Sequence, residues 1–188
     1  KDDVVALQNF CFISVETDGT SFEMHALVQL ATRRWLTAHG RFEKWKQRYL
    51  TNFDTALPVG RHENWATCQM LFPHANAAEG HEPVDERSLQ QWASILHKSA
   101  WYAQEMGRYG EAERMARKAV RARRKALGPK NDDTLSSIGM LALTYWSQGR
   151  WKEAEELEVQ VMETRKRVLG DEHPDTLTSM ANLASTYW

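Results

Sequence analysis

The 188-residue sequence predicts a mainly α protein, in which helix pairs stack into an α-α superhelix preceded by a small β-hairpin. The superhelix is predicted by a segment that matches itself when it is shifted by 42 residues, from Thr134 to Thr176. It is also predicted by apolar residues that recur at helical spacing within each copy. The hairpin is predicted by two short strand-like runs on either side of Asp18-Gly19.

The internal repeat predicts two complete units and the first helix of a third. The same spacing joins GRYGEAE, residues 107–113, to GRWKEAE, residues 149–155. Because one such unit cannot bury its apolar faces alone, neighbouring units are expected to stack. Identical pairs at this spacing include Leu135 and Leu177, Leu141 and Leu183, Ala142 and Ala184, Tyr145 and Tyr187, and Trp146 and Trp188.

Each unit is predicted to contain two amphipathic helices that cross closely. In the second unit a tight turn at Gly149 joins the helices, and the small side chains of Ala142 and Ala154 allow close approach. The apolar stripe of the first helix is Leu135, Ile138, Leu141, Ala142 and Tyr145, and that of the second is Ala154, Leu157, Val161 and Leu169.

Residues between the helices predict how each helix begins and ends. Gly170 is the expected left-handed cap of the second helix, because glycine adopts a positive φ without steric cost. Asp175 is the expected N-cap of the following helix, with Pro174 stopping the segment before it. Asp133 is the expected N-cap one period earlier.

These residues resemble the 42-residue tetratricopeptide repeat (TPR) of the kinesin light chain type. A small residue, an aromatic, Gly, an aromatic and Ala recur at fixed offsets, and the resemblance extends from Ser88 to the end of the chain. It implies helical hairpins whose first helices line an inner groove. Glu158 departs from the pattern, since this class of repeat usually carries an aromatic residue there.

The composition argues against nucleic acid or an anionic membrane as the partner, since the formal net charge is -1. An apolar content of 42% and eight tryptophans suffice for a core. Cys11 and Cys68 make no disulfide framework, and neither they nor the histidines show the spacing of a metal site. With no signal peptide and no apolar run long enough to span a bilayer, we expect a reducing, cytoplasmic setting.

Residues 1–38 predict the C-terminal part of a winged-helix domain. The expected order is a helix tail at 4–7, strands over 10–15 and 21–23 joined by a turn at 17–20, and a helix from Met24. FISVETDGTSFEMHALVQLATRRWL, residues 12–36, resembles the end of this domain in NB-ARC-type STAND ATPases. That nucleotide-switched family includes plant and fungal immune receptors, and in its fungal members repeats follow the ATPase directly.

Met24-His25-Ala26 falls on the Met-His-Asp motif of that family. The resemblance implies that His25 contacts the β-phosphate of bound ADP, so that ADP or ATP is a cofactor of the full-length protein and not of this chain alone. Ala26 replaces the Asp that braces this loop in the family. The alternative for His25 is a structural role, as an ordinary residue at the start of an amphipathic helix.

Residues 39–82 predict a helical connector, and residues 83–188 predict the repeat array. In the connector, a helix that ends at Pro58 is followed by a second helix, bent or restarted at Pro73. ENWATCQMLFPHA, residues 63–75, resembles the segment that precedes the repeats in the fungal proteins. The first helix of the first repeat is expected over residues 88–106.

Ligand contacts are expected in the inner groove that the first helices line. Trp101 and Trp146 would anchor an extended or helical peptide, unless they only pack between repeats. Asn182 matches an Asn that the family places beside this face to bind peptide backbone. The candidate groove is His97, Lys98, Trp101, Gln104, Met140, Leu143, Trp146, Asn182 and Ser185, with Ser94, Ser136, Gly139, Thr178, Ala181 and Trp188 at further groove positions.

A basic cluster covers one side of the second helix of the first repeat. It could grip an acidic peptide or phosphates, but the favoured interpretation is a solvated outer face paired with acids such as Glu153, Glu155 and Glu156. The cluster is Arg114, Arg117, Lys118, Arg121, Arg124 and Lys125.

The sequence thus predicts a fragment of a longer protein: the non-catalytic interaction and sensor region of a nucleotide-switched STAND (NB-ARC-TPR) receptor. The repeats would bind a protein or peptide ligand, or restrain the ATPase module of the same protein. The alternative is a cargo or scaffold adaptor of the kinesin light chain kind. We also expect self-association through the C-terminal helix, whose apolar stripe includes Leu177 and Leu183.

The chain on its own is predicted to bind neither ADP nor ATP, because His25 is present without a phosphate-binding loop of the form G-x-x-x-x-G-K-[ST]. Isothermal titration calorimetry of the purified chain with each nucleotide checks this. A dissociation constant in the micromolar range for either nucleotide would contradict it.

Overall fold

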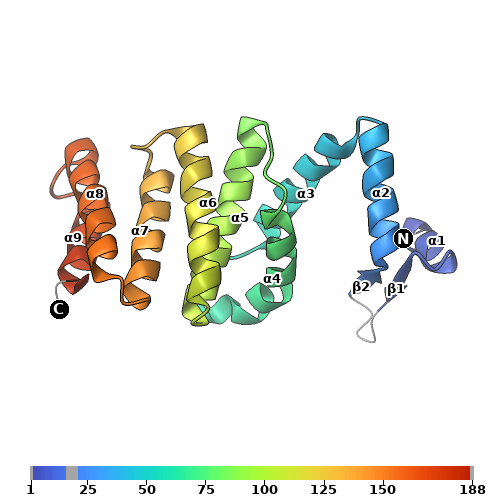
Figure 1. Ribbon diagram of the computed structural model, residues 1–188, viewed down its shortest axis with the longest axis horizontal. Helices are drawn as coiled ribbons and strands as arrows, with labels where there is room; N and C mark the ends of the chain where they lie inside the picture. The colour runs from blue at the N-terminus through green and yellow to red at the C-terminus, as the bar shows by residue number, and fades with distance from the viewer. Residues whose placement is uncertain (1, 16–20, 187–188) are drawn as a thin grey trace. The chain divides into compact units, whose positions relative to one another are not determined.

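The computed structural model describes residues 2–15 and 21–186, with side chains from Val4 onward. Its contacts divide the chain into two compact units, Lys1–Lys46 and Gln47–Trp188. The boundary falls inside one helix, α3 (Phe42–Ala56). Figure 1 shows the helices of each unit and the small hairpin of the first. The mainly α fold with a β-hairpin and stacked helix pairs is confirmed.

The first unit contains α1 (Asp2–Asn9), an antiparallel pair β1 (Ile13–Val15) and β2 (Phe22–Met24), and α2 (Ala26–Ala38). The strands pair Ile13 with Met24 and Val15 with Phe22. The expected turn at 17–20 lies outside the described residues.

The first strand is shorter than the predicted run over residues 10–15, because the backbone there closes α1 instead. Cys11 has a φ of 57°, and its N–H donates to the carbonyl of Gln8 at 2.8 Å. The N–H of Phe12 donates to the carbonyl of Leu7 at 2.9 Å, which completes a left-handed helix end. The residues before Ile13 are therefore committed to the helix cap and not to the sheet.

The second unit begins with the rest of α3, the short 3₁₀ turn η1 (His62–Asn64) and α4 (Trp65–Glu79). The second connector helix does not restart at Pro73, since α4 runs through this residue without ending. Gly60, before α4, allows the chain to approach the first repeat helix, α5 (Glu86–Glu105), closely: a Cβ at Gly60 would lie 2.5 Å from the backbone nitrogen of Tyr102 in α5. Cys68 is buried in the core, as its place on an apolar face predicts.

The repeat helices are α5 (Glu86–Glu105), α6 (Tyr109–Leu127), α7 (Asp132–Ser147), α8 (Trp151–Leu169) and α9 (Pro174–Thr186). Each helix packs against the next one in the chain, so the helix pairs form a continuous stack (Figure 1). The core follows the predicted apolar stripes, with Ile138, Ala142 and Ala154 fully buried, and Trp92 and Leu96 of α5 are fully buried as well. Leu169 is an exception, because it lies in the last turn of α8 and is 38% exposed.

The helix caps differ in part from the prediction. Asn131 and not Asp133 caps α7, accepting a hydrogen bond from the N–H of Asp133 at 3.0 Å. His173 does the same for α9, where its Nδ1 accepts from the N–H of Asp175 at 3.2 Å. Each helix thus begins one residue before the Asp. Pro174 is the first residue of α9, a position at which the missing N–H costs no hydrogen bond. Gly170 has the predicted positive φ of 94° but an extended ψ of 165°, outside the left-handed helical region.

Two buried arginines that the sequence analysis did not single out tie each second helix to the following unit. Arg123 of α6 donates through Nη1 to the carbonyl of Asp133 at 2.7 Å and to Oγ of Ser137 at 2.8 Å. One period later, Arg165 of α8 donates to the carbonyl of Asp175 at 3.3 Å and to Oγ of Ser179 at 3.0 Å. We call these contacts the arginine clamps.

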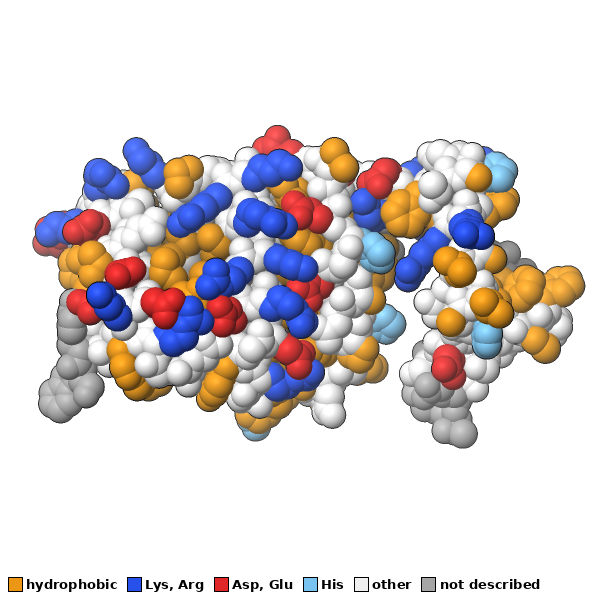
Figure 2. Space-filling model, in the orientation of Figure 1, with side chains coloured by type: hydrophobic (Ala, Val, Ile, Leu, Met, Phe, Trp, Pro, Cys, Tyr) orange, Lys and Arg blue, Asp and Glu red, His pale blue; other side chains and the backbone are white. Residues whose placement is uncertain are grey.

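The basic cluster of α6 forms a solvated face whose ion pairs include acidic residues outside the predicted set. Glu153, one of the expected partners, pairs with Arg150. On the face seen in Figure 2, Lys and Arg side chains lie among Asp and Glu side chains over the repeat helices. The observed pairs are Arg114 and Lys118 with Glu79 at 2.9 and 3.0 Å, Arg121 with Glu82, and Arg117 with Glu113 at 2.9 Å.

The last described helix, α9, leaves part of its apolar stripe uncovered. Leu177 is 52% exposed, Met180 and Leu183 are half-buried, and Ala184 is exposed. By contrast, Thr176 and Ser179 of the same helix are buried against α8. Self-association through this face stays a prediction.

The close crossing of α7 and α8 predicts that Ala142→Leu destabilises the protein by about 1–3 kcal/mol, because a fully buried position cannot accept the extra bulk without strain. Chemical denaturation measures the change. Ala184→Leu is the matched control, since Ala184 occupies the same place in the next unit but is exposed. Equal stability of the two variants would show that the helix pair is wrongly assigned.

Candidate functional site

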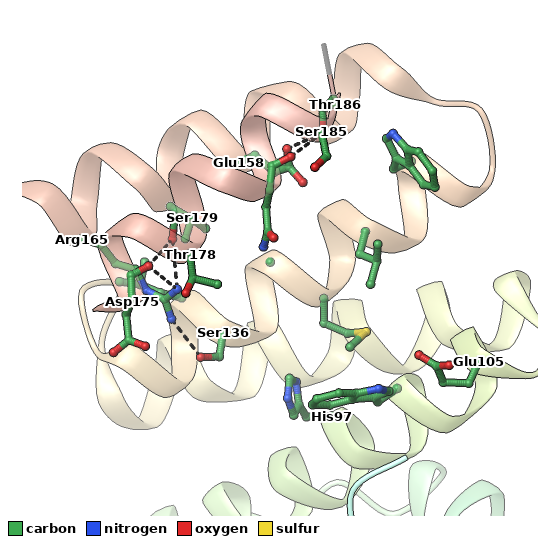
Figure 3. Close-up of a pocket in the computed structure, with 18 residues that line it drawn as sticks. His97, Glu105, Ser136, Glu158, Arg165, Asp175, Thr178, Ser179, Ser185 and Thr186 are labelled. Carbon is green, nitrogen blue, oxygen red and sulfur yellow. Dashed lines mark hydrogen bonds between the residues drawn. The ribbon is translucent and has the colours of Figure 1, made fainter. Parts of the chain in front are cut away.

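An open cavity of about 690 Å³ lies along the first helices of the repeats, between α5, α7, α8 and α9. We call it the groove. Figure 3 shows His97 on α5 at one side and Glu158, Ser185 and Thr186 at the other. Its lining residues are His97, Trp101, Glu105, Leu135, Ser136, Gly139, Met140, Leu143, Trp146, Glu158, Val161, Arg165, Asp175, Thr178, Ser179, Asn182, Ser185 and Thr186.

Most of the residues predicted for the inner groove line this cavity. They are His97, Trp101, Met140, Leu143, Trp146, Asn182 and Ser185, together with Ser136, Gly139 and Thr178. Ser94 and Ala181 are not among its lining residues, and Trp188 lies outside the described residues. The predicted face therefore converges on one cavity.

Lys98 and Gln104 do not line the groove, because each has a partner elsewhere. The Nζ of Lys98 pairs with Oδ1 of Asp54, 2.8 Å away on α3. The Nε2 of Gln104 donates to Oγ of Ser147 at 2.6 Å. These contacts turn both side chains toward neighbouring helices and remove them from the predicted site.

The two predicted aromatic anchors differ in exposure. Trp101 is half-buried and packs against the core, which supports its alternative role between repeats. Trp146 is 39% exposed and meets Trp151 edge to face, with 5.6 Å between the ring centroids. Leu143 beside it is 41% exposed. Trp146 and Leu143 thus offer apolar surface to a ligand within the groove.

The floor of the groove comes from α8, a second helix, and sequence reasoning missed it. Glu158, Val161 and Arg165 line the cavity, although their exposed fractions are only 8%, 4% and 8%. Arg165 is held by Oδ1 of Asp132 at 2.8 Å. It is also held by Oγ of Ser136 at 3.2 Å, the contact drawn in Figure 3. The departure of Glu158 from the repeat pattern was the one signal in the sequence.

Burial and two nearby positive charges lower the pKa of His97, which also lies at the end of a short hydrogen-bond chain. Oγ of Ser137 accepts from Nη1 of Arg123 at 2.8 Å, so its own proton is free to point at Nδ1 of His97, 3.4 Å away. Burial, with the positive charges of Arg123 and Lys98 nearby, lowers the pKa of His97 from 6.5 to about 4. At neutral pH this groove residue therefore adds no positive charge.

His25 belongs to the other unit and caps α2. Its Nδ1 accepts a hydrogen bond from the N–H of Leu27 at 3.2 Å, and the side chain is exposed. This is the structural role that the sequence left open, and it uses only one of the two ring nitrogens.

The described residues offer neither a metal site nor a membrane-spanning helix. No three His, Cys, Asp or Glu side chains in that part of the chain gather where they could hold a metal ion. Nor does any helix there combine the length and apolar character needed to cross a bilayer.

Comparison with known proteins identifies the repeats. Residues 92–133 and 134–175 each match the family model described as Tetratricopeptide repeat. The two units are tetratricopeptide repeats. Arrays of these repeats present concave surfaces for binding other proteins, which agrees with an interaction module.

The chain is also similar to a nucleotide-binding leucine-rich repeat (NLR)-like protein from the fungus Hyaloscypha variabilis. The two are 36% identical over 132 residues, which is 70% of this chain and 13% of that protein. The predicted resemblance to a fungal NLR-like protein with tetratricopeptide repeats is confirmed. The chain spans a small part of the length of this relative.

The depressed pKa of His97 predicts a loss of stability in acid. Below about pH 6.5 the unfolded chain takes up a proton that folded His97 refuses until about pH 4, so stability falls as the pH drops through this range. Between about pH 7 and about pH 5, wild type should lose about 1–2 kcal/mol more than His97→Gln. Denaturant titrations of both proteins at each pH measure the difference, and parallel losses would contradict the assignment.

Proposed function

We propose that the groove binds an extended or helical peptide segment of a partner protein, and that the chain is the interaction and sensor region of a nucleotide-switched receptor. The observation that carries the proposal is an open cavity into which Trp146 and Leu143 expose apolar surface. Large aromatic side chains in such positions supply much of the binding energy at protein interfaces. The similarity to a fungal NLR-like protein supports the receptor context.

The groove offers polar groups beside the apolar ones, as peptide recognition requires. Asn182 lines it, and in this family an Asn beside this face binds peptide backbone. Ser185 and Thr178 are further hydroxyl groups on the same helix, α9. A peptide could thus satisfy its backbone on α9 while its side chains pack on α5 and α7.

The nucleotide switch would involve His25. Because its Nδ1 accepts the hydrogen bond from Leu27, the neutral ring carries its proton on Nε2. We propose that this exposed Nε2–H donates to a phosphate oxygen when the full-length protein holds ADP. The chain has no phosphate-binding loop of its own, so this contact depends on an ATPase module, which the repeats would restrain or release.

Selection of short random peptides displayed on phage tests the groove as a binding site. Peptides selected on the wild-type chain should lose affinity about tenfold or more on Trp146→Ala, and less strongly on Leu143→Ala. The reason is that these variants remove the apolar surface on which the peptides pack.

The matched control is Leu177→Ala, which truncates a leucine of similar exposure that does not line the groove. Its affinity for the selected peptides should equal that of wild type. Peptides that bind all four proteins equally, or no selected peptides, would count against the groove as the binding site.

A further inference from the structure

Glu158 is a buried carboxylate that faces the groove without a cationic partner. It is 8% exposed, and its hydrogen bond in the described structure comes from the hydroxyl of Thr186, which donates to Oε2 at 2.5 Å. No Lys, Arg or His of the described residues forms an ion pair with it. Burial raises the pKa of Glu158, the expected response of a carboxyl group that lacks compensation.

Comparison within the array shows that packing does not require an acid at this place. One period before Glu158, α6 carries Ala116, which is 1% exposed in the equivalent position. A methyl group therefore fills the same site in the first repeat. In the second repeat, the larger, charged side chain of Glu158 lines the floor of the groove.

The groove's other charges favour a cation as well. Glu105 and Asp175 line it, and His97 is neutral at physiological pH. The positive charge of Arg165 is already engaged, because its Nη2 lies 2.8 Å from Oδ1 of Asp132. A cation that enters the groove thus meets the carboxylate of Glu158 without a competing ion pair, whereas the guanidinium of Arg165 already has an acidic partner.

We propose that the groove recognises a peptide segment carrying an arginine, whose guanidinium pairs with the carboxylate of Glu158. This inference rests on the proposed function of the groove. Oε2 accepts the hydrogen bond from Thr186, which leaves Oε1 as the acceptor for the guanidinium. Planar guanidinium suits the site better than ammonium, because it is less strongly hydrated and also stacks on aromatic faces such as those of Trp101 and Trp146.

The test uses the peptides selected on the wild-type chain and synthesised individually. Arginine should be enriched among them. Replacing that arginine with citrulline, which keeps the shape and removes the charge, should weaken binding to wild type about tenfold or more in calorimetry. On Glu158→Gln the arginine and citrulline peptides should bind equally, because the partner charge is absent.

Two variants control for indirect effects. Glu156→Gln removes an exposed carboxylate from the same helix, and it should keep the preference for arginine over citrulline. Glu158→Ala restores the residue of the first repeat and should lose the preference while remaining folded, as judged by circular dichroism. Loss of the preference in both Glu158 variants, but not in Glu156→Gln, supports a direct pair.

The outcomes separate this inference from the proposed function. Peptides that need Trp146 but carry no arginine, or whose arginine is insensitive to Glu158, would overturn the arginine site and leave the groove standing. An enrichment in acidic residues would do the same. If no peptide depends on Trp146, the groove itself is refuted as the binding site, and the arginine site with it.

Discussion

The register of the array depends on the arginine clamps, in which each second helix extends a buried guanidinium to the first turns of the next unit. Arg123 and Arg165 are 7% and 8% exposed, and each bonds a backbone carbonyl and a serine hydroxyl of the following helix. A buried guanidinium without partners is costly, so only the stacking that supplies those acceptors is stable. Ser137 and Ser179 recur at the repeat spacing because the clamp recurs.

The groove follows from this register. Arg165 belongs to both features, since it clamps α9 and lines the cavity. Oγ of Ser137 likewise accepts from Arg123 and lies 3.4 Å from Nδ1 of His97, so the contact that joins two repeats also reaches a groove histidine. Packing between units and the chemistry of the groove are therefore determined by the same hydrogen bonds.

The outer and inner faces differ in how their charges are satisfied. On the outer face, Arg114 and Lys118 both form ion pairs with Glu79, which join α6 to α4. These positive charges are therefore already paired and offer little to a charged ligand. In the groove the carboxylate of Glu158 has no such partner among the described residues. Selectivity for a charged ligand is thus expected inside the groove, because only unpaired charge gains appreciably from a new partner.

The sequence by itself determined the repeat, the helix pairs and the buried stripes, because these depend on side-chain spacing that one copy shares with the next. Ala142, Ile138 and Ala154 could be assigned to the core from that spacing alone. The same spacing identified Trp146 and Leu143 as groove residues, since the exposed side of a first helix follows once its buried side is known.

The tertiary structure alone decided which polar residues belong to the groove. The side chain of Lys98 points out of the groove because it pairs with Asp54, a residue 44 positions earlier on another helix. No local sequence pattern indicates such a contact. Asn131 and His173 cap the helices in place of the expected Asp133 and Asp175. Neighbouring residues offer equivalent hydrogen-bond acceptors, and the residue at which each helix starts decides which acceptor is the cap. Glu158 and Arg165 line the groove because part of α8 is left uncovered between the first helices α7 and α9. That gap exists only once the repeats are packed.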